Sequence, residues 1–278
     1  MAVKRKGLVE GTMEREQIIK ALLKKEHYDF DDLVRIMELL RLPGGCLWDA
    51  EQTHESIRDN MIEETYEVIE AIDKKDTKLL REELGDALLQ VVFHARIEEE
   101  AESFNISDVV NDISEKLIHR HPHVFGSVKA TTAEEMLANW ERIKVEEKKR
   151  ATLTSRLEAV PPMLPALMRA SKIAKKTEFF YGARSEEEAY RAVEDALREL
   201  KAASNEEREE LLGEVLYATA VLCRKLSISG EASLTKSINR RIAEIRAAES
   251  NCNEKSLEDM DEKELMALRL KVDALLKK

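Results

Sequence analysis

Two clusters of acidic residues lie close together in the first half of the chain, and their side chains are the ones best suited to chemistry. They have the sequences EETYE, residues 63–67, and EELGD, residues 82–86. At about 100° per residue, Glu63, Glu64 and Glu67 fall on one face of a helix. Glu83 and Asp86 are spaced as neighbours on the next helix. The spacing therefore predicts two helices that each present carboxylates on one side.

A short polar segment of sequence DKKD, residues 73–76, separates the two predicted helices. It is long enough only for a turn, so the helices should pack antiparallel with their acids facing each other. Carboxylates held close together and partly out of water either take up protons or bind a cation. A ligand set made only of carboxylates suits a hard, oxygen-preferring ion, which predicts magnesium, or alternatively manganese. The other interpretation is a solvated acidic surface, which is common on charged helices.

The elements that must position these acids are helices, because the sequence is poor in residues that break them. The 278 residues include only 9 Gly and 5 Pro, and aromatic residues make up 5%. These features predict an all-α protein, and the length predicts about two domains. Residues 84–93 are apolar over more than one face, so we expect their helix to be buried on more than one side.

Charge and hydropathy limit the partners of the protein. The net charge of −11 makes a general nucleic-acid scaffold a poor fit, and we expect no nucleic-acid partner. No apolar run approaches the roughly 20 residues of a membrane span, and the basic N-terminus has no apolar segment after it, so we expect no membrane partner and a cytoplasmic location. The three cysteines lie far apart without a CxxC spacing, which indicates neither disulfides nor a thiolate zinc site.

A glycine-rich loop with one of the two tryptophans follows an amphipathic helix over residues 31–42, for which Asp31 or Asp32 is the predicted N-cap. The loop has the sequence GGCLWDAEQT, residues 44–53. Trp48 in such a loop either covers the core or stacks on a nucleotide base. Both interpretations stay open at this stage.

Basic residues after the acidic helices could contact phosphate. Lys116 and Arg120 lie four residues apart near the end of a helix that Ser107 is predicted to cap, so they share one face and could bind phosphate oxygens. Trp140 and Lys144 have the same spacing on a helix whose predicted cap is Thr132, although Lys144 could also be an ordinary solvated cation. Zinc at His121 and His123 is disfavoured, because a proline separates them and no cysteine is near.

The second half of the sequence repeats the first in weaker form. Gly85-Asp86-Ala87-Leu88-Leu89 and Arg96 correspond to Gly213-Glu214-Val215-Leu216-Tyr217 and Arg224, which indicates an internal duplication. Where the first copy has Glu63, Glu64 and Glu67, we align Glu194, Asp195 and Arg198, and Leu211 stands in place of Glu83. Because a set with Leu and Arg is a poor magnesium site, the second copy should be structural.

Several of these motifs together resemble the MazG family of the all-α nucleoside triphosphate pyrophosphatases, closely over about residues 39–148 and more loosely beyond. They are GGCLWD at 44–49, QT at 52–53, EETYE at 63–67, ELGD at 83–86, RHPHVF at 120–125, and Trp140 with Lys144. The resemblance implies tandem helical-bundle domains completed by dimerisation. It also implies magnesium ligands at Glu64, Glu67, Glu83 and Asp86, and cleavage of a nucleoside triphosphate into a monophosphate and pyrophosphate.

The chain departs from the family pattern in two ways. Leu47 stands where the family usually has proline, which removes no ligand. Some members work mainly through the second domain, whose acids are eroded here, so we assign catalysis to the first half. The predicted organisation is an N-terminal extension (1–30), a catalytic domain (31–150), a linker (151–165) and a degenerate structural domain (166–278).

Together with this resemblance, the sequence predicts a magnesium-dependent nucleoside triphosphate pyrophosphohydrolase that forms a homodimer and serves house-cleaning or nucleotide-pool control. The predicted catalytic residues are Glu63, Glu64, Glu67, Glu83 and Asp86, and the predicted substrate-binding residues are Trp48, Lys116, Arg120, Trp140 and Lys144. The alternative from another class is a non-catalytic helical protein used for dimerisation or regulation.

Overall fold

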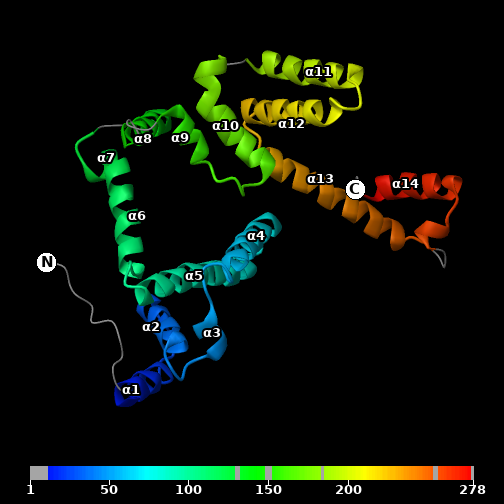
Figure 1. Cartoon of the computed structure of the whole chain (residues 1–278). Helices are drawn as coiled ribbons and strands as arrows, with labels where there is room; N and C mark the ends of the chain where they lie inside the picture. The colour runs from blue at the N-terminus through cyan, green and yellow to red at the C-terminus, as the bar shows by residue number, and fades with distance from the viewer. Residues whose placement is uncertain (1–11, 129–131, 148–151, 183–184, 253–255, 277–278) are drawn as a thin grey trace. The chain divides into compact units, whose positions relative to one another are not determined.

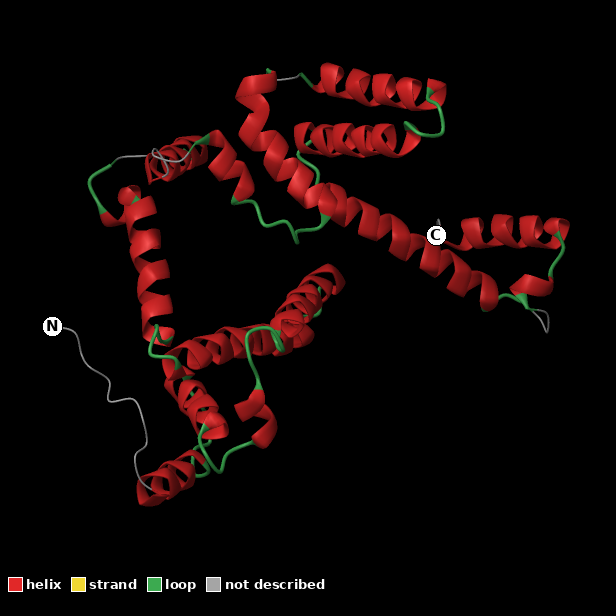
Figure 2. Ribbon diagram, viewed as in Figure 1, coloured by secondary structure: helices red, strands yellow, loops and turns green. Residues whose placement is uncertain are grey.

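The computed structural model describes residues 12–128, 132–147, 152–182, 185–252 and 256–276. Every regular element in these ranges is a helix (Figure 2), which confirms the all-α prediction. The chain divides into two compact units, Met1–Glu147 and Lys148–Lys278. Dimerisation of the bundles stays a prediction.

The helices of the two units follow one another along the chain as Figure 1 labels them. In the first unit they are α1 (Thr12–Leu22), α2 (Phe30–Arg41), α3 (Leu47–Glu51), α4 (Arg58–Lys74), α5 (Thr77–Glu100), α6 (Ile106–Arg120), α7 (Pro122–Phe125) and α8 (Ala133–Glu147). In the second unit they are α9 (Leu153–Glu158), α10 (Ala166–Tyr181), α11 (Glu186–Ala202), α12 (Arg208–Lys225), α13 (Gly230–Glu249), the 3-10 helix η1 (Leu257–Asp259) and α14 (Glu262–Leu276). The segment expected to be a linker thus contains the short helix α9.

The core of the first unit forms where α2 and the second half of α5 meet the starts of α4 and α6. Its buried residues are Met37, Ile57, Val92, Phe93, Ala95 and Ile106. Two of the helices that bring these residues together, α2 and α6, have N-cap residues that differ from those the sequence predicted. Asp29, not Asp31 or Asp32, caps α2, accepting from the Asp32 amide at 3.0 Å while Asp32 accepts from the Asp29 amide at 2.9 Å. Asn105, not Ser107, caps α6 in the same reciprocal way.

Helices α4 and α5 form the antiparallel pair that the sequence predicted. Lys75, directly after α4, adopts a left-handed conformation with φ of 56° and turns the chain. Asp76 then caps α5 by accepting from the backbone amides of Lys78 and Leu79, each at 3.0 Å. This tight connection brings the two acidic clusters onto neighbouring helices.

The apolar surface of α5 is buried only in part within one chain. Val92 and Phe93, in the second half, lie in the core, whereas Leu84 and Leu88, in the first half, are exposed. On α4, the exposed large apolar side chains are Ile62, Tyr66, Ile69 and Ile72. The expectation that α5 is buried on more than one side is therefore met only in its second half, where Val92, Phe93 and Ala95 belong to the core.

The second unit repeats the antiparallel pair as α11 and α12, with α10 packed against α12. α4 and α11 both contain 17 residues, and the same sequence offset relates Arg58 to Glu186 and Gly85 to Gly213. This register pairs Glu64 with Ala192 and Glu67 with Asp195, so our sequence alignment of Glu194, Asp195 and Arg198 was wrong by three residues, about one helical turn.

None of the helices in the described ranges is both long and apolar enough to cross a membrane.

Candidate functional site

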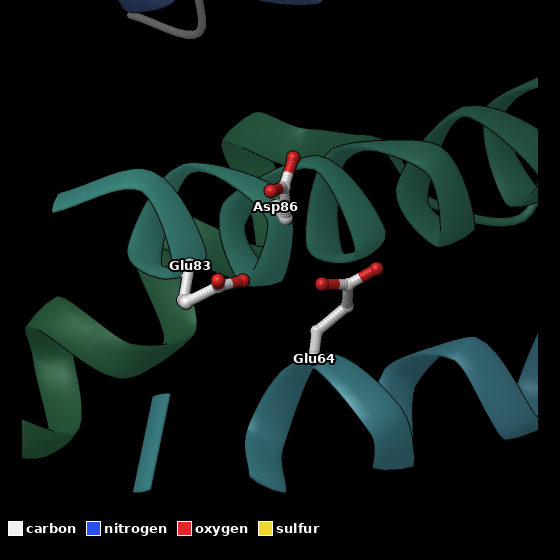
Figure 3. A group of neighbouring side chains, drawn as sticks. All are labelled: Glu64, Glu83 and Asp86. Carbon is white, nitrogen blue, oxygen red and sulfur yellow. The ribbon is translucent and has the colours of Figure 1, made fainter. Parts of the chain in front are cut away.

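Three carboxylates from the two acidic clusters converge between α4 and α5. Glu64 projects from α4 toward Glu83 and Asp86 on α5 (Figure 3). One carboxylate oxygen from each side chain lies within 4.8 Å of the other two. In the described part of the chain, this is the only group of three or more His, Cys, Asp or Glu side chains close enough to share an ion.

The surroundings of this cluster disfavour its negative charge. Glu64 and Glu83 are half-buried, and loss of solvent is the first cause that raises the pKa of both carboxyl groups above the usual value of 4.5. The charge of Asp86 raises the pKa of Glu64 further, and the charge of Glu67 raises that of Glu83. A bound cation would relieve this repulsion.

The other two predicted acids lie at the edge of the cluster or away from it. Glu67 is one turn after Glu64 on α4 and is near enough for its charge and hydrogen bonding to raise the pKa of Glu64. Its carboxylate does not belong to the group of three. Glu63 is exposed on α4. The geometry therefore favours Glu64, Glu83 and Asp86 as the ligand core, with Glu67 beside it.

A donor set of this kind fits a hard divalent ion. The three side chains offer only oxygen atoms, which magnesium and manganese prefer to nitrogen or sulfur ligands. Their oxygen atoms lie within 4.8 Å of one another, so side-chain adjustments would have to bring them closer to share one ion. The residues present thus fit the ion that the sequence predicted.

The structure separates Trp48 from the core. Trp48 lies on α3 and is 59% exposed, so it does not act as a lid on the core. Its backbone carbonyl accepts a hydrogen bond from Gln52 Nε2 at 2.7 Å. Of the two interpretations from the sequence, an exposed aromatic ring available for stacking is the one that agrees with this position.

Arg120 and Trp140 form a second cluster at the far end of α6. The guanidinium carbon of Arg120 lies 5.9 Å from the centre of the Trp140 ring, within the range of a cation–π contact. Lys116 is exposed one turn earlier on α6, and Lys144 lies on α8 with its side chain outside the described residues. The spacing grouped Lys116 with Arg120 and Trp140 with Lys144, whereas the contact in the structure joins Arg120 of the first pair to Trp140 of the second.

The basic cluster does not lie beside the carboxylates of the same chain. At 1.5 Å per residue, Arg120 is about 20 Å from the start of α6 and Asp86 is about 20 Å from the end of α5. Figure 1 shows α6 leaving the end of α5 and extending away from it. The predicted metal ligands and the predicted phosphate ligands are thus at opposite ends of a two-helix arm.

Sequence reasoning missed a histidine pair that involves the second half of α5. His54 Nδ1 and His94 Nδ1 are 2.7 Å apart with stacked rings, and His54 Nε2 contacts Glu98 Oε1 at 2.8 Å. The pair joins the segment after α3 to α5. Nothing in the spacing of these residues signals the contact, because they are far apart along the chain.

The fold and the site together define an all-α protein whose candidate centre is a carboxylate cluster on an antiparallel helix pair. A family model described as the MazG nucleotide pyrophosphohydrolase domain matches residues 52–125, which include all of these carboxylates. The chain is similar to a Thermotoga maritima protein named nucleoside triphosphate pyrophosphohydrolase/pyrophosphatase MazG, at 42% identity over 222 residues, 79% of this chain and 85% of that protein.

Two further relatives extend the comparison. An Escherichia coli K12 protein named nucleoside triphosphate pyrophosphohydrolase is 40% identical over 226 residues, 77% of this chain and 86% of that protein. The Bacillus subtilis protein YabN, described as uncharacterized, is 50% identical over 149 residues, 54% of this chain and 30% of that protein. The chain therefore belongs to the MazG family of nucleotide pyrophosphohydrolases, which are hydrolases of phosphoric anhydrides.

Proposed function

We propose that this protein is a magnesium-dependent nucleoside triphosphate pyrophosphohydrolase. Water attacks the α-phosphorus, the bond to the oxygen that bridges the α- and β-phosphorus breaks, and the products are a nucleoside monophosphate and pyrophosphate. The observation that supports this proposal is the convergence of Glu64, Glu83 and Asp86 in a chain of this family. Manganese is the alternative ion, since it accepts the same oxygen ligands.

The carboxylates have two tasks in this proposal. Glu64, Glu83 and Asp86 hold the ion, and when bound, magnesium supplies Lewis acidity to the phosphate oxygens. Glu67 lies beside the ligand core without belonging to it. It is therefore free to accept the proton of the attacking water as a general base, provided that the water lies within hydrogen-bond reach.

A second copy of the chain would complete the site. The exposed apolar side chains of α4 and the first half of α5 form the kind of surface that a homodimer covers, and they flank the carboxylates. A partner placed there could also bring its own Lys116 and Arg120 to the phosphates, which those residues do not reach within their own chain. The Arg120 guanidinium would then stabilise the negative charge that develops on phosphate oxygens.

The proposed role is removal of aberrant nucleotides or control of the nucleotide pool, in the cytoplasm where these nucleotides are found. It rests on the reaction, because the release of pyrophosphate removes a triphosphate from the pool of polymerase substrates. The competing proposal, a non-catalytic dimerisation or regulatory protein, predicts no turnover of any nucleotide.

The decisive experiment incubates the full chain with a panel of nucleoside triphosphates, with magnesium, with manganese and with a chelator. We expect monophosphate and pyrophosphate in equal amounts, only with a metal present, as measured by ion-exchange chromatography. Diphosphate and orthophosphate as the first products would contradict the reaction. No turnover of any nucleotide, together with an intact dimer, would favour the non-catalytic alternative.

A further inference from the structure

The segment that carries Trp48, residues 43–56 and hereafter the Trp48 segment, is held by side chains from three helices. From α2, Arg41 Nη1 donates to the carbonyls of Asp49 at 2.5 Å and Gln52 at 3.1 Å. The same guanidinium pairs with Glu100 at 2.8 Å, which ties the segment to α5. His54 contacts α5 a second time through the histidine pair. These contacts fix the end of the segment.

The beginning of the segment is held by α1, which the sequence placed in an extension without an assigned role. Arg15 Nη1 donates to the Pro43 carbonyl at 3.0 Å, and Arg15 Nη2 donates to the Gly44 carbonyl at 2.6 Å. One planar guanidinium therefore binds two successive carbonyls, which is a geometry that the lysine ammonium cannot reproduce. At this joint between α1 and the Trp48 segment, Arg15 Nε is buried and has no hydrogen-bond partner in the described structure, while the two carbonyl contacts of the guanidinium lie near the surface.

The glycine at position 44 leaves room for this arginine. Gly44 has a φ of 80°, a left-handed conformation that other residues adopt only with strain. A Cβ atom on Gly44 would lie 2.7 Å from Arg15 Nη1 and would displace the guanidinium. The next residue, Gly45, donates to the Leu42 carbonyl at 2.8 Å and continues the turn toward α3. Glycine at position 44 thus serves both the turn and the close approach of Arg15.

A fixed segment matters because its tryptophan is exposed. Trp48 lies four residues after Gly44 and presents most of its surface to solvent. An exposed ring on a mobile loop loses conformational freedom when it binds a ligand, and this loss weakens binding. When the loop is ordered by the fold, the ring is oriented before the ligand arrives. Contacts that order this segment should therefore favour ligand binding rather than the chemical step.

We propose that Arg15 is a positioning residue for substrate binding, which holds the Trp48 segment so that Trp48 stacks on the nucleotide base. This inference rests on the proposed nucleotide hydrolysis and adds α1 to the machinery of that site. Arg15 acts through the backbone of residues 43 and 44 and does not touch the substrate. Its loss should therefore weaken nucleotide binding and leave the chemistry of the carboxylates unchanged.

The first test needs no activity. Hydrogen exchange of the full chain should show faster exchange at the amides of residues 44–50 in Arg15→Ala, and an intermediate rate in Arg15→Lys, which keeps the charge but not the paired donors. Lys20→Ala on the same helix is the matched control, since Lys20 pairs only with Glu16 on the surface among the described contacts. Equal exchange in Arg15→Ala and wild type would overturn the proposed joint.

The second test separates binding from chemistry. Arg15→Ala should raise KM for nucleoside triphosphates about three- to tenfold with kcat within about twofold of wild type. Gly44→Ala attacks the same joint from the other side and should give the same change. The double variant should be no worse than either single one, because residues that act through one contact are not additive. A fall in kcat at unchanged KM would contradict positioning of the substrate.

Tryptophan fluorescence links the joint to Trp48 itself. The chain has two tryptophans, so the nucleotide-induced quenching that Trp48→Phe removes is the part that belongs to Trp48. We expect a nucleotide to quench the emission of wild type, Trp48→Phe to remove part of that quenching, and Arg15→Ala to require a higher nucleotide concentration for the same quenching. Equal quenching in Trp48→Phe and wild type would reject stacking by Trp48. Failure of wild type to hydrolyse any nucleotide would reject the proposed function instead, and the exchange result would still decide the joint.

Discussion

At the scale of single residues, the candidate site is defined by which carboxylates meet. Five acids share the two predicted faces, but the side chains that converge are Glu64, Glu83 and Asp86. Spacing alone correctly placed acids on one face of each helix. Spacing could not show which of the five acids meet, because that depends on how far α4 and α5 are shifted along each other. The turn at Lys75 and the packing of the two helices set this shift.

The first prediction concerns these ligands. Glu64→Gln and Asp86→Asn keep side-chain volume but remove a ligand charge, so each should lower kcat/KM at least about 100-fold with magnesium. Without metal, the melting temperature should rise or stay unchanged, because one repelling charge is gone. The control is Asp59→Asn, which changes an exposed acid on α4 outside the cluster and should keep wild-type activity. Near-normal activity of both ligand variants would show that the site lies elsewhere.

The second prediction concerns the histidine pair. Burial, followed by the charge of His54, lowers the pKa of His94 from its usual 6.5. The unfolded chain then binds a proton more readily than the folded chain, so the free energy of unfolding should decrease as pH falls below about 6.5. Glu98, whose pKa is lowered by its hydrogen bond to His54, adds a further loss as pH falls below 4.5.

Melting curves between pH 8 and pH 5 measure this effect. His94→Gln should flatten the decrease in melting temperature, whereas His27→Gln, at an exposed position outside the pair, should leave it unchanged. The same slope in His94→Gln and wild type would mean that other groups control the acid response.

At the scale of elements, the helices themselves were predictable and several of their ends were not. The low glycine and proline content and the apolar periodicity predicted α2, α4, α5 and α6. Their caps were ambiguous, because Asp29, Asp31 and Asp32 are all good N-cap residues, and the reciprocal hydrogen bonds of Asp29 and Asp32 decide between them. The joint between Arg15 and Gly44 could not be predicted from the sequence, since it joins a residue of α1 to a residue of the loop between α2 and α3, and no local pattern relates the two.

The third prediction belongs to the turn between α4 and α5. Lys75 adopts a left-handed conformation that costs a non-glycine residue about 1 kcal/mol. Lys75→Gly should therefore leave the free energy of unfolding unchanged or raise it by up to about 1 kcal/mol. The matched variant Lys74→Gly lies within the last turn of α4 and should lower it by about 0.5–1 kcal/mol. Urea denaturation distinguishes the two, and a loss of stability in Lys75→Gly would contradict this account.

At the scale of the whole molecule, each unit has apolar surface that its own chain leaves exposed. On the antiparallel pair of the first unit, Ile69 is 46% exposed and Leu88 is 40% exposed. The sequence indicated that this surface would be covered, because the apolar positions of the helix outnumber those of one core-facing stripe. A single sequence cannot say which chain covers it.

The fourth prediction tests a second copy as that cover. Ile69→Lys and Leu88→Lys should shift the protein from dimer to monomer, because a buried ammonium without a partner opposes association. Sedimentation velocity measures the shift, and Asp59→Lys at an exposed position of α4 should leave the dimer intact. If wild type sediments as a monomer at all concentrations, homodimerisation is wrong.

The alignment of the second unit with the first shows which residues would have to change to give the second unit a full set of carboxylates. The second unit keeps Asp195 and Glu214 at the positions of Glu67 and Asp86, and a cavity of about 720 Å³ is lined by both residues and by Ala192. Ala192→Glu and Leu211→Glu together would therefore restore the full set of four carboxylates. In a chain whose first-unit site is disrupted by Glu83→Gln, we expect Ala192→Glu and Leu211→Glu together to create a manganese site that electron paramagnetic resonance detects. Neither change alone should create it. Such a signal would show that the second unit differs from a metal-binding domain by two substitutions, and its absence would contradict the register.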